Sequence, residues 1–532
     1  MIRVKNLVFA PSYTQNDLTT RIKNVFSCDE SDIVSLRISS KSLDARRGKQ
    51  LSWIINADVE LKNESTFAKS AKAEIVYPFV KKEYVFPPVT KVTSFRPVVV
   101  GFGPAGIFCS LMLAQSGYKP IIVERGDEME KRAEKVSLFN ATGSLNTESN
   151  IQFGEGGAGA FSDGKLTTLI KDKDNRCAYV LEQFVLFGAP DEILYLSHPH
   201  IGTDLLRGVI TNIREKIKKL GGEFRFGCRL TDIETDGDAI TGAVINGSEK
   251  IVTDSVFLCI GHSARDTFEM LASKGIEMEQ KPFSVGVRIE HRQKDINKAR
   301  YHGFASSPFL PNAEYKAVAH TKNGRALYTF CMCPGGRVVA AASEKNGVVT
   351  NGMSFHSRDG ENANSALLVS VEKTDIGGGK PLDGVAFQRK LEQKAYEVGG
   401  GDYKAPAQTV GDFLKGRKTN AFGSVTPTYP RGVTGADLND VLPPFVCETL
   451  KEGIKLLDNR IPGFASSDAV LTGVESRSTC PVRCVRDPYT MQTKIKGLYP
   501  AGEGAGYAGG IMSAASDGIK CAEAYIADRR TE

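Results

Sequence analysis

Residues 97–126 constrain the fold of this chain more than any other segment, because they place a strand, a glycine turn, a helix and a second strand in close succession. The three valines at 98–100 form an apolar run of the kind that is buried in a parallel sheet. The turn follows as Gly-Phe-Gly-Pro-Ala-Gly, and the second strand ends in Glu124. This order of elements predicts a dinucleotide-binding unit in an α/β fold.

Each glycine of the turn has a separate task in such a unit. Gly101 permits the tight turn, Gly103 lets the backbone approach a pyrophosphate, and Gly106 lets the helix pack on the strand. The helix directs its free N–H groups at the phosphates. Glu124 would accept hydrogen bonds from both ribose hydroxyls, which favours FAD or NAD over NADP. The candidate cofactor-binding residues of this segment are Gly101, Gly103, Pro104, Ala105, Gly106, Glu124 and Arg125.

Three further segments resemble the glutathione-reductase-like superfamily of two-dinucleotide-binding flavoproteins, and this resemblance implies non-covalent FAD. Residues 151–166 resemble its glycine-rich loop along the flavin, 256–263 its closing strand, and 497–518 its C-terminal flavin motif. The family usually has Asp where this chain has Glu503, whose side chain is one methylene longer. The resemblance adds the candidate FAD-binding residues Gly157, Ala158, Gly159, Asp163, Gly164, Lys165, Arg229, Leu230, Gly261, Gly502, Glu503, Gly509, Gly510, Ile511 and Met512.

Over its full length the chain resembles the bacterial FAD-dependent dehydrogenases known as NAD(FAD)-utilizing dehydrogenases. The segments that carry this resemblance are 42–49, 342–369 and 475–488, together with the flavin segments. The resemblance implies an FAD-dependent oxidoreductase and leaves the substrate open.

The expected fold class is α/β, with a Rossmann-type FAD-binding domain that is split in the sequence. Residues 1–90 predict a small N-terminal α/β domain, ferredoxin-like in its order of strand, helix, strand, strand, helix, strand, and Asn16 is the expected N-cap of its first helix. The FAD motifs lie in 91–278 and 468–532. Between them, 279–467 alternates strand-like pieces with turns, which predicts an inserted β-rich substrate domain.

The segment at 475–488 directly precedes the C-terminal flavin motif, so the resemblance places it near the flavin. Glu475 and Arg477 are therefore the candidate catalytic residues, because a carboxyl can protonate a substrate and a guanidinium can bind one. Arg483 and Arg486 could hold an anion. The alternative is a structural ion-pair network that supports the loop.

Two pairs of cysteines stand out by their spacing, Cys331 with Cys333 and Cys480 with Cys484. A disulfide reductase of this superfamily normally carries its redox pair after the glycine-rich loop, where this chain has Cys177 alone. We therefore expect free structural thiols at both pairs. Neither pair has a companion histidine motif, so no metal site is expected.

The distribution of charged and apolar residues limits the binding partners and the cellular location that we expect. Residues 1–96 hold 16 Lys or Arg and 10 Asp or Glu, which accounts for the net charge of +6. These charges are spread out, as on an ordinary solvated face, so nucleic acid is an unlikely partner. A flavin-dependent RNA-modifying enzyme and a non-enzymatic binding protein on the same fold are the alternative readings. No membrane span is expected, and the N-terminus lacks a signal-peptide run, so we expect a cytoplasmic protein.

The sequence contains no second dinucleotide-binding motif for an electron donor. No second glycine unit of this type follows residue 126, so NAD(P)H, if it is the donor, must dock transiently. A small-molecule substrate would lie between the flavin and the inserted domain, since ligands tend to occupy domain interfaces. The sequence leaves the substrate, the donor or acceptor, and the oligomeric state open.

Overall fold

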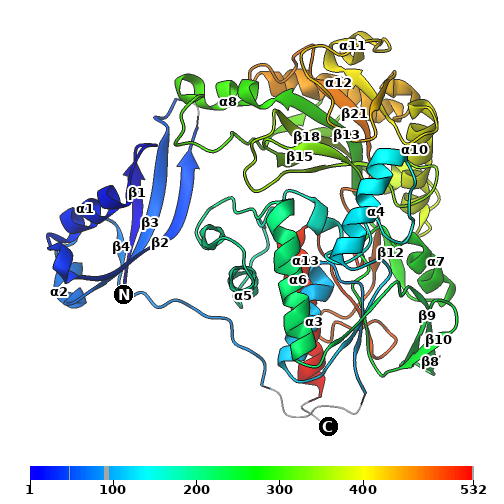
Figure 1. Cartoon of the computed structure of the whole chain (residues 1–532), viewed down its shortest axis with the longest axis horizontal. Helices are drawn as coiled ribbons and strands as arrows, with labels where there is room; N and C mark the ends of the chain where they lie inside the picture. Colours follow the sequence, from blue (N-terminus) through cyan, green and yellow to red (C-terminus); the bar gives the residue numbers. More distant parts are fainter. Residues whose placement is uncertain (47, 89–94, 530–532) are drawn as a thin grey trace.

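Three sheets form the framework of the chain in the computed structural model, which describes residues 1–46, 48–88 and 95–529 (Figure 1). One has four strands near the N-terminus, one has five parallel strands, and one has seven strands. The protein is thus a mixed α/β structure. The predicted domain boundary at residues 90 and 91 lies outside the described residues.

The N-terminal sheet has the predicted order of elements, with strands arranged β2-β3-β1-β4 and each antiparallel to its neighbours. Its elements are β1 (Ile2–Phe9), α1 (Gln15–Phe26), β2 (Ile33–Asp44), β3 (Ser52–Leu61), α2 (Glu64–Lys69) and β4 (Ile75–Val76). The expected N-cap was wrong by two residues. Thr14 caps α1, because its side chain accepts from the Asp17 N–H and the Asp17 carboxylate accepts from the Thr14 N–H at 2.7 Å.

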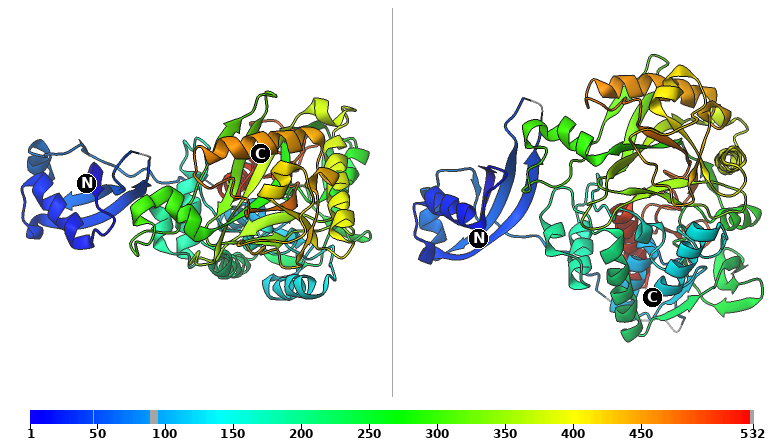
Figure 2. Two further views of the ribbon diagram at one scale, coloured as in Figure 1. Left: turned by 90° about the horizontal axis from the view of Figure 1, so that it is seen from above. Right: turned by 45° about the horizontal axis from the view of Figure 1, so that its top comes forward.

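This N-terminal unit stands to one side of the rest of the chain in all three views (Figures 1 and 2). It touches the main body through backbone hydrogen bonds of β2. The Lys41 N–H donates to the Tyr195 carbonyl at 2.7 Å, and the Ser197 N–H donates to the Lys41 carbonyl at 2.9 Å. Some of its basic side chains are paired locally, as Arg3 is with Asp58 at 2.6 Å. The unit has an apolar core of its own.

The five-stranded sheet has the order β23-β11-β5-β6-β7, with all strands parallel. Its strands are β5 (Val98–Val100), β6 (Ile121–Glu124), β7 (Glu223–Phe226), β11 (Val256–Leu258) and β23 (Leu498–Pro500). The helices α3 (Pro104–Gln115), α6 (Thr203–Lys219) and α13 (Ile511–Asp528) lie side by side over it, and α3 packs against both others (Figure 1). The sheet therefore joins strands from distant parts of the sequence.

The seven-stranded sheet has the order β14-β15-β18-β13-β21-β19-β20, antiparallel except for the pair β19 and β20. Its strands are β13 (Phe283–Arg292), β14 (Val318–His320), β15 (Ala326–Cys333), β18 (Asn362–Val371), β19 (Ala405–Thr409), β20 (Val433–Gly435) and β21 (Val470–Glu475). The helices α10 (Asp383–Gly399) and α12 (Pro444–Asp458) pack against it. This part is therefore more helical than the expected β-rich domain.

The position of β21 corrects one predicted boundary. The sequence assigned 468–532 to the FAD-binding part, but β21 pairs with β13 and β19 inside the seven-stranded sheet. A boundary between residues 467 and 468 therefore cuts that sheet. All six residues of β21 are buried, so the strand has no polar face that distinguishes one sheet from the other.

Smaller elements complete the described ranges. The remaining strands form small sheets from β8 (Leu230–Asp236), β9 (Ala239–Ile245) and β10 (Glu249–Val252), from β12 (Met278–Gln280) and β22 (Val482–Cys484), and from β16 (Arg337–Ala340) and β17 (Thr350–Met353). The remaining α-helices are α4 (Met129–Thr142), α5 (Arg176–Leu186), α7 (Arg265–Ser273), α8 (Gln293–Tyr301), α9 (Lys373–Ile376) and α11 (Val410–Lys415). Across these ranges, no helix combines the length and apolar character that a membrane crossing requires.

Candidate functional site

A cavity of about 400 Å³ lies where the parallel sheet meets the seven-stranded sheet. Residues at or just beyond the carboxyl ends of β5, β6, β11 and β23 form one side, and residues of β15, β17 and β21 form another. Ligands of open α/β sheets bind outside the carboxyl ends of the strands. The predicted site residues that line it are Gly101, Gly103, Pro104, Ala105, Glu124, Arg125, Gly157, Ala158, Gly159, Lys165, Arg229, Leu230, Gly261, Glu475, Arg477, Glu503, Gly509, Gly510 and Ile511.

The other predicted residues lie outside the lining; they are Gly106, Asp163, Gly164, Gly502 and Met512. A Cβ on Gly106 would lie 1.9 Å from the Gly101 carbonyl oxygen, so only glycine fits where the helix meets the strand. Asp163 is fully buried and pairs with Arg358 at 2.5 Å. These two residues therefore support the walls of the cavity from behind.

Glycines at the cavity leave room for a ligand beside the backbone. A Cβ on Gly261 or Gly510 would meet no protein atom within 4 Å, and one on Gly103 would meet its first neighbour at 3.6 Å. The N-termini of α3 and α13, at Pro104 and Ile511, also border the cavity. Helix N-termini attract anions through free N–H groups and the helix dipole. Two such termini and open glycine backbone fit FAD.

Glu124 is fixed in the cavity wall by the backbone. Its carboxylate accepts hydrogen bonds from the N–H groups of Phe102 at 2.8 Å, Gly126 at 3.0 Å and Gly154 at 2.9 Å. A carboxylate offers about four acceptor sites, so one remains for a ribose hydroxyl. The residue is only 5% exposed, and this rigid placement suits the predicted contact.

His262 is a site residue that the sequence reasoning did not include. It lines the cavity, and its Nδ1 lies 2.8 Å from a carboxylate oxygen of Glu503. Its Nε2 is buried and has no hydrogen-bond partner among the described residues. Buried polar atoms of this kind usually have a partner, so Nε2 is a candidate contact for a bound ligand. The only signal in the sequence was its position just after β11.

Glu475 lies at the end of β21, buried and at the cavity wall. The Arg288 guanidinium donates to it at 3.1 Å, and the Thr350 hydroxyl lies 3.5 Å away. Burial raises the pKa of Glu475 to about 7, although the positive charge of Arg288 acts in the opposite direction. A carboxyl with this pKa can hold or release a proton near neutral pH, as acid–base catalysis requires.

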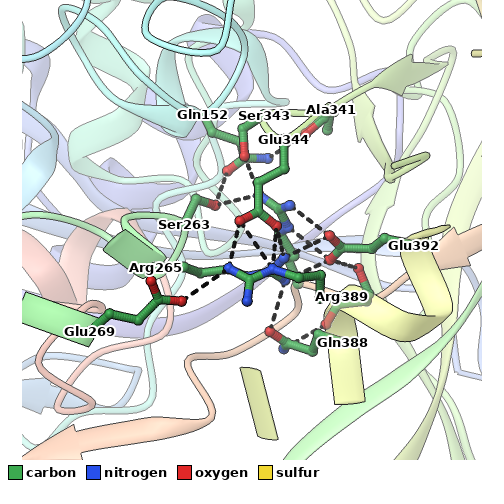
Figure 3. A network of polar contacts seen from close by, with 12 residues as sticks. Gln152, Ser263, Arg265, Glu269, Ala341, Ser343, Glu344, Gln388, Arg389 and Glu392 are labelled. Atoms are coloured by element: carbon green, nitrogen blue, oxygen red, sulfur yellow. Dashed lines mark hydrogen bonds and ion pairs between the residues drawn. The ribbon is translucent and has the colours of Figure 1, made fainter. Parts of the chain in front are cut away.

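Arg477 lines the cavity, but its charge is engaged by Glu392. Glu392 belongs to a buried network that also includes Arg265 (Figure 3). Arg477 donates to the Glu392 carboxylate at 2.9 and 2.7 Å, and Arg265 donates to the same carboxylate at 2.8 and 2.7 Å. Burial acts to raise the pKa of Glu392, but Arg265 and Arg477 outweigh it and hold this pKa far below its usual value. This is the ion-pair network that the sequence left open as the alternative to substrate binding. Arg477 is therefore a positioning residue.

Arg486 also belongs to a structural contact. Its guanidinium pairs with Asp517 at 2.6 Å and lies 3.8 Å from the ring centre of Tyr507. No ion pair joins Arg483 to a described residue, and its guanidinium carbon lies 5.5 Å from the same ring. Arg486 thus holds the loop onto α13 and is not free to bind an anion.

None of the eleven cysteines, which all lie in the described ranges, forms a disulfide. Cys480 and Cys484 are buried, and burial raises the pKa of both thiols, that of Cys484 to about 12. Cys331, in contrast, lines the cavity with Cys333 buried behind it. Among the described residues, no cluster of His, Cys, Asp and Glu is arranged to hold a metal ion.

Comparisons with known proteins agree with a flavin site. The family model described as "FAD-dependent protein, C-terminal domain-like" matches residues 282–478. A protein from Clostridium beijerinckii, described as uncharacterized, is 47% identical over 527 residues, which cover 99% of this chain and 98% of that protein. The FAD-dependent monooxygenase nanF of Aspergillus nanangensis is 26% identical over 179 residues, covering 32% of this chain and 34% of that protein.

Solved structures of flavoenzymes match over most of the chain at low similarity. The flavin-dependent brominase Bmp2 has a TM-score of 0.38 and 13% identity, covering 82% of this chain and 80% of that chain. FrdA of the quinol fumarate reductase from E. coli has a TM-score of 0.38 and 12% identity, and the match covers 83% of this chain and 71% of that chain. Scores this low carry no argument about the reaction.

Proposed function

This chain belongs to the same family as its full-length relative from Clostridium beijerinckii, and we propose that it is an FAD-dependent oxidoreductase of the NAD(FAD)-utilizing dehydrogenase type. FAD is its cofactor. When bound, the flavin supplies hydride and electron transfer. One observation carries the proposal: the cofactor-binding backbone and an ionisable carboxyl, Glu475, border the same cavity.

The backbone around the cavity would bind FAD from two sides. The N-terminus of α3 would direct its N–H groups at the pyrophosphate, and Glu124 would accept from the ribose. The N-terminus of α13 would supply positive partial charge that stabilises a reduced, negatively charged flavin. We propose that the segments around the parallel sheet bind FAD and that the part with the seven-stranded sheet binds substrate.

Glu475 would act as the acid or base toward the substrate. Its pKa near neutrality makes both protonation states accessible, and Arg288 fixes the carboxyl at the cavity wall. Lys316 and Phe330 line the same cavity as Glu475, and a small-molecule substrate would bind there. The donor would be NAD(P)H docking transiently, and the protein would work in the cytoplasm.

Anaerobic reduction of the purified holoprotein tests the proposal. NADH or NADPH should bleach the visible absorbance of the flavin, and an added electron acceptor should restore it. Glu475→Gln should keep its FAD, because the carboxyl lies on the β21 wall, but should be reduced more slowly. A protein that purifies without FAD refutes the proposal. A flavin that stays oxidised with both nucleotides refutes the NAD(P)H donor.

A further inference from the structure

Cys331 lines the cavity and Cys333 is buried behind it, and a regular strand would keep these two thiols apart. Side chains two residues apart in a strand point to one face but are separated by about 6.5 Å along it. In β15 the register with β18 shifts between Phe330 and Cys333, so the strand bulges there. Cys331 adopts a φ of 45° in this bulge. As a result, the Cys333 thiol lies against Cys331: its Sγ donates to the Cys331 carbonyl at 3.3 Å, and each thiol shifts the pKa of the other.

This backbone conformation is unusual for the residue that adopts it. A positive φ in this range is uncommon and unfavourable outside glycine. Conformations of this kind persist where the surroundings enforce them, and they cluster at functional sites. Here the Arg288 guanidinium enforces it by donating to the Cys331 carbonyl at 2.6 Å, and the Lys165 ammonium donates to the next carbonyl, that of Met332.

The two thiols differ in exposure and in charge. Cys331 is partly exposed to the cavity, whereas Cys333 is buried, with its Sγ 3.5 Å from the Arg288 guanidinium. The hydrogen bond from Cys333 and the positive charges of Arg288 and Lys165 hold the pKa of the Cys331 thiol below its usual value. The pKa of Cys333 is raised, first by the same hydrogen bond and then by burial. An accessible thiolate beside a protonated partner is the arrangement found in reactive dithiols.

We propose that Cys331 and Cys333 are a redox-active dithiol that exchanges an electron pair with the FAD bound in the same cavity. Oxidation breaks two S–H bonds, forms one S–S bond and releases two electrons and two protons. FAD takes up both electrons and both protons and becomes FADH2. In the reverse direction FADH2 cleaves the disulfide and restores both thiols. This inference rests on the proposed flavin oxidoreductase function and adds a second electron store to it.

The position of Cys331 in the cavity lining distinguishes this pair from the other closely spaced cysteines. Cys480 and Cys484 are buried, their thiols have raised pKa values, and neither lines the cavity. A thiol in apolar surroundings is a poor nucleophile because the thiolate is the reactive form. Cys484 therefore provides a matched control.

A reductive titration of the holoprotein counts the electrons. Air-oxidised protein, titrated anaerobically with dithionite, should take up four electrons per FAD, two for the flavin and two for the disulfide. Cys331→Ser and Cys333→Ser should each take up two, and Cys484→Ser should take up four like the wild type. Uptake of two electrons by the wild type overturns the proposal.

Mass spectrometry identifies the cysteines that are oxidised and reduced. Trypsin cleaves after Arg325 and Arg337, and the peptide 326–337 carries both cysteines of the pair and no others. In the oxidised holoprotein this peptide should resist alkylation and weigh two hydrogens less than the dithiol. After photoreduction of the flavin it should take up two alkyl groups. An oxidised sample in which both cysteines alkylate freely overturns the proposal.

The two proposals fail in different ways. Photoreduction and dithionite do not depend on a nucleotide donor, so the thiol readouts do not require NAD(P)H to react. A wild-type flavin that is reduced by NAD(P)H while peptide 326–337 stays unchanged refutes the dithiol and leaves the oxidoreductase intact. A disulfide that is cleaved on photoreduction in a protein inert to NAD(P)H supports the dithiol and refutes only the nucleotide donor.

Discussion

Replacing Glu392 by Gln removes the shared counter-ion of two buried arginines. Glu392 is 1% exposed, and Arg265 and Arg477 each donate to both of its carboxylate oxygens. Glutamine keeps the size of the side chain but not its charge. Removing one partner of a buried ion pair costs about 3–5 kcal/mol. Arg265 keeps Glu344 as a second anionic partner, whereas Arg477 keeps only serine hydroxyls, so we expect a loss of about 4 kcal/mol.

Urea unfolding, followed by far-UV circular dichroism and by release of the flavin, measures this loss. Glu397→Gln is the control, because Glu397 lies on the same helix, is 65% exposed and pairs with Lys394 at 3.6 Å; we expect it to cost less than about 0.5 kcal/mol. The pKa of Glu392 is lowered, so its contribution is complete above the usual pKa of a carboxyl and is lost progressively as pH falls from there toward the lowered pKa. The difference should therefore persist at about pH 5 and shrink in more acidic solution. Equal stabilities of the two variants would refute the reasoning.

Three further changes test the cavity itself. Gly510→Leu should abolish FAD binding without unfolding the protein, because Gly510 lines the cavity and a Cβ there would meet no protein atom within 4 Å. Gly208→Leu, on the exposed face of α6, should keep its FAD, and equal flavin content in both variants would show that the cavity is not the site. The rate of flavin reduction, measured by stopped flow, should change across about pH 7 as Glu475 loses its proton. Glu475→Gln should abolish this pH dependence. A transition near pH 7 that persists in the variant would show that another group titrates there. Glu124→Gln sets an amide against three N–H donors, so the Kd for FAD should rise roughly 10- to 100-fold, and an unchanged Kd in a fluorescence titration would exclude the ribose contact.

Local geometry is the part of the fold that the sequence predicts well. The spacing of Gly101, Gly103 and Gly106 specifies a turn between a strand and a helix within a few residues, and the structure has both elements there. The sequence does not predict which sheet a fully buried strand joins. The six residues of β21 are all buried, and an apolar run alone does not say which of two sheets receives it.

The parts of the site that the sequence missed depend on contacts between distant residues. Glu392 is one of three acidic residues on α10, and only the fold brings it to Arg265, 127 residues away in the chain. The bulge at Cys331 is equally hidden, because a C-x-C pair in an alternating strand gives no sign of a positive φ. His262 had a signal only in its place after β11. Chain packing, not residue type, selects these side chains.

The parallel sheet also sets the order in which the protein can be completed during synthesis. β11 ends at Leu258, whereas its neighbour β23 begins only at Leu498. A ribosome that adds about 5–20 residues per second needs roughly 12–48 s for the intervening chain. Throughout that interval one edge of β11 has no partner, and unpaired edges invite association with other chains. Because α13 follows β23 in the chain, the nascent protein acquires a complete cavity only after both have been synthesised, and we expect it to capture FAD only from that point on.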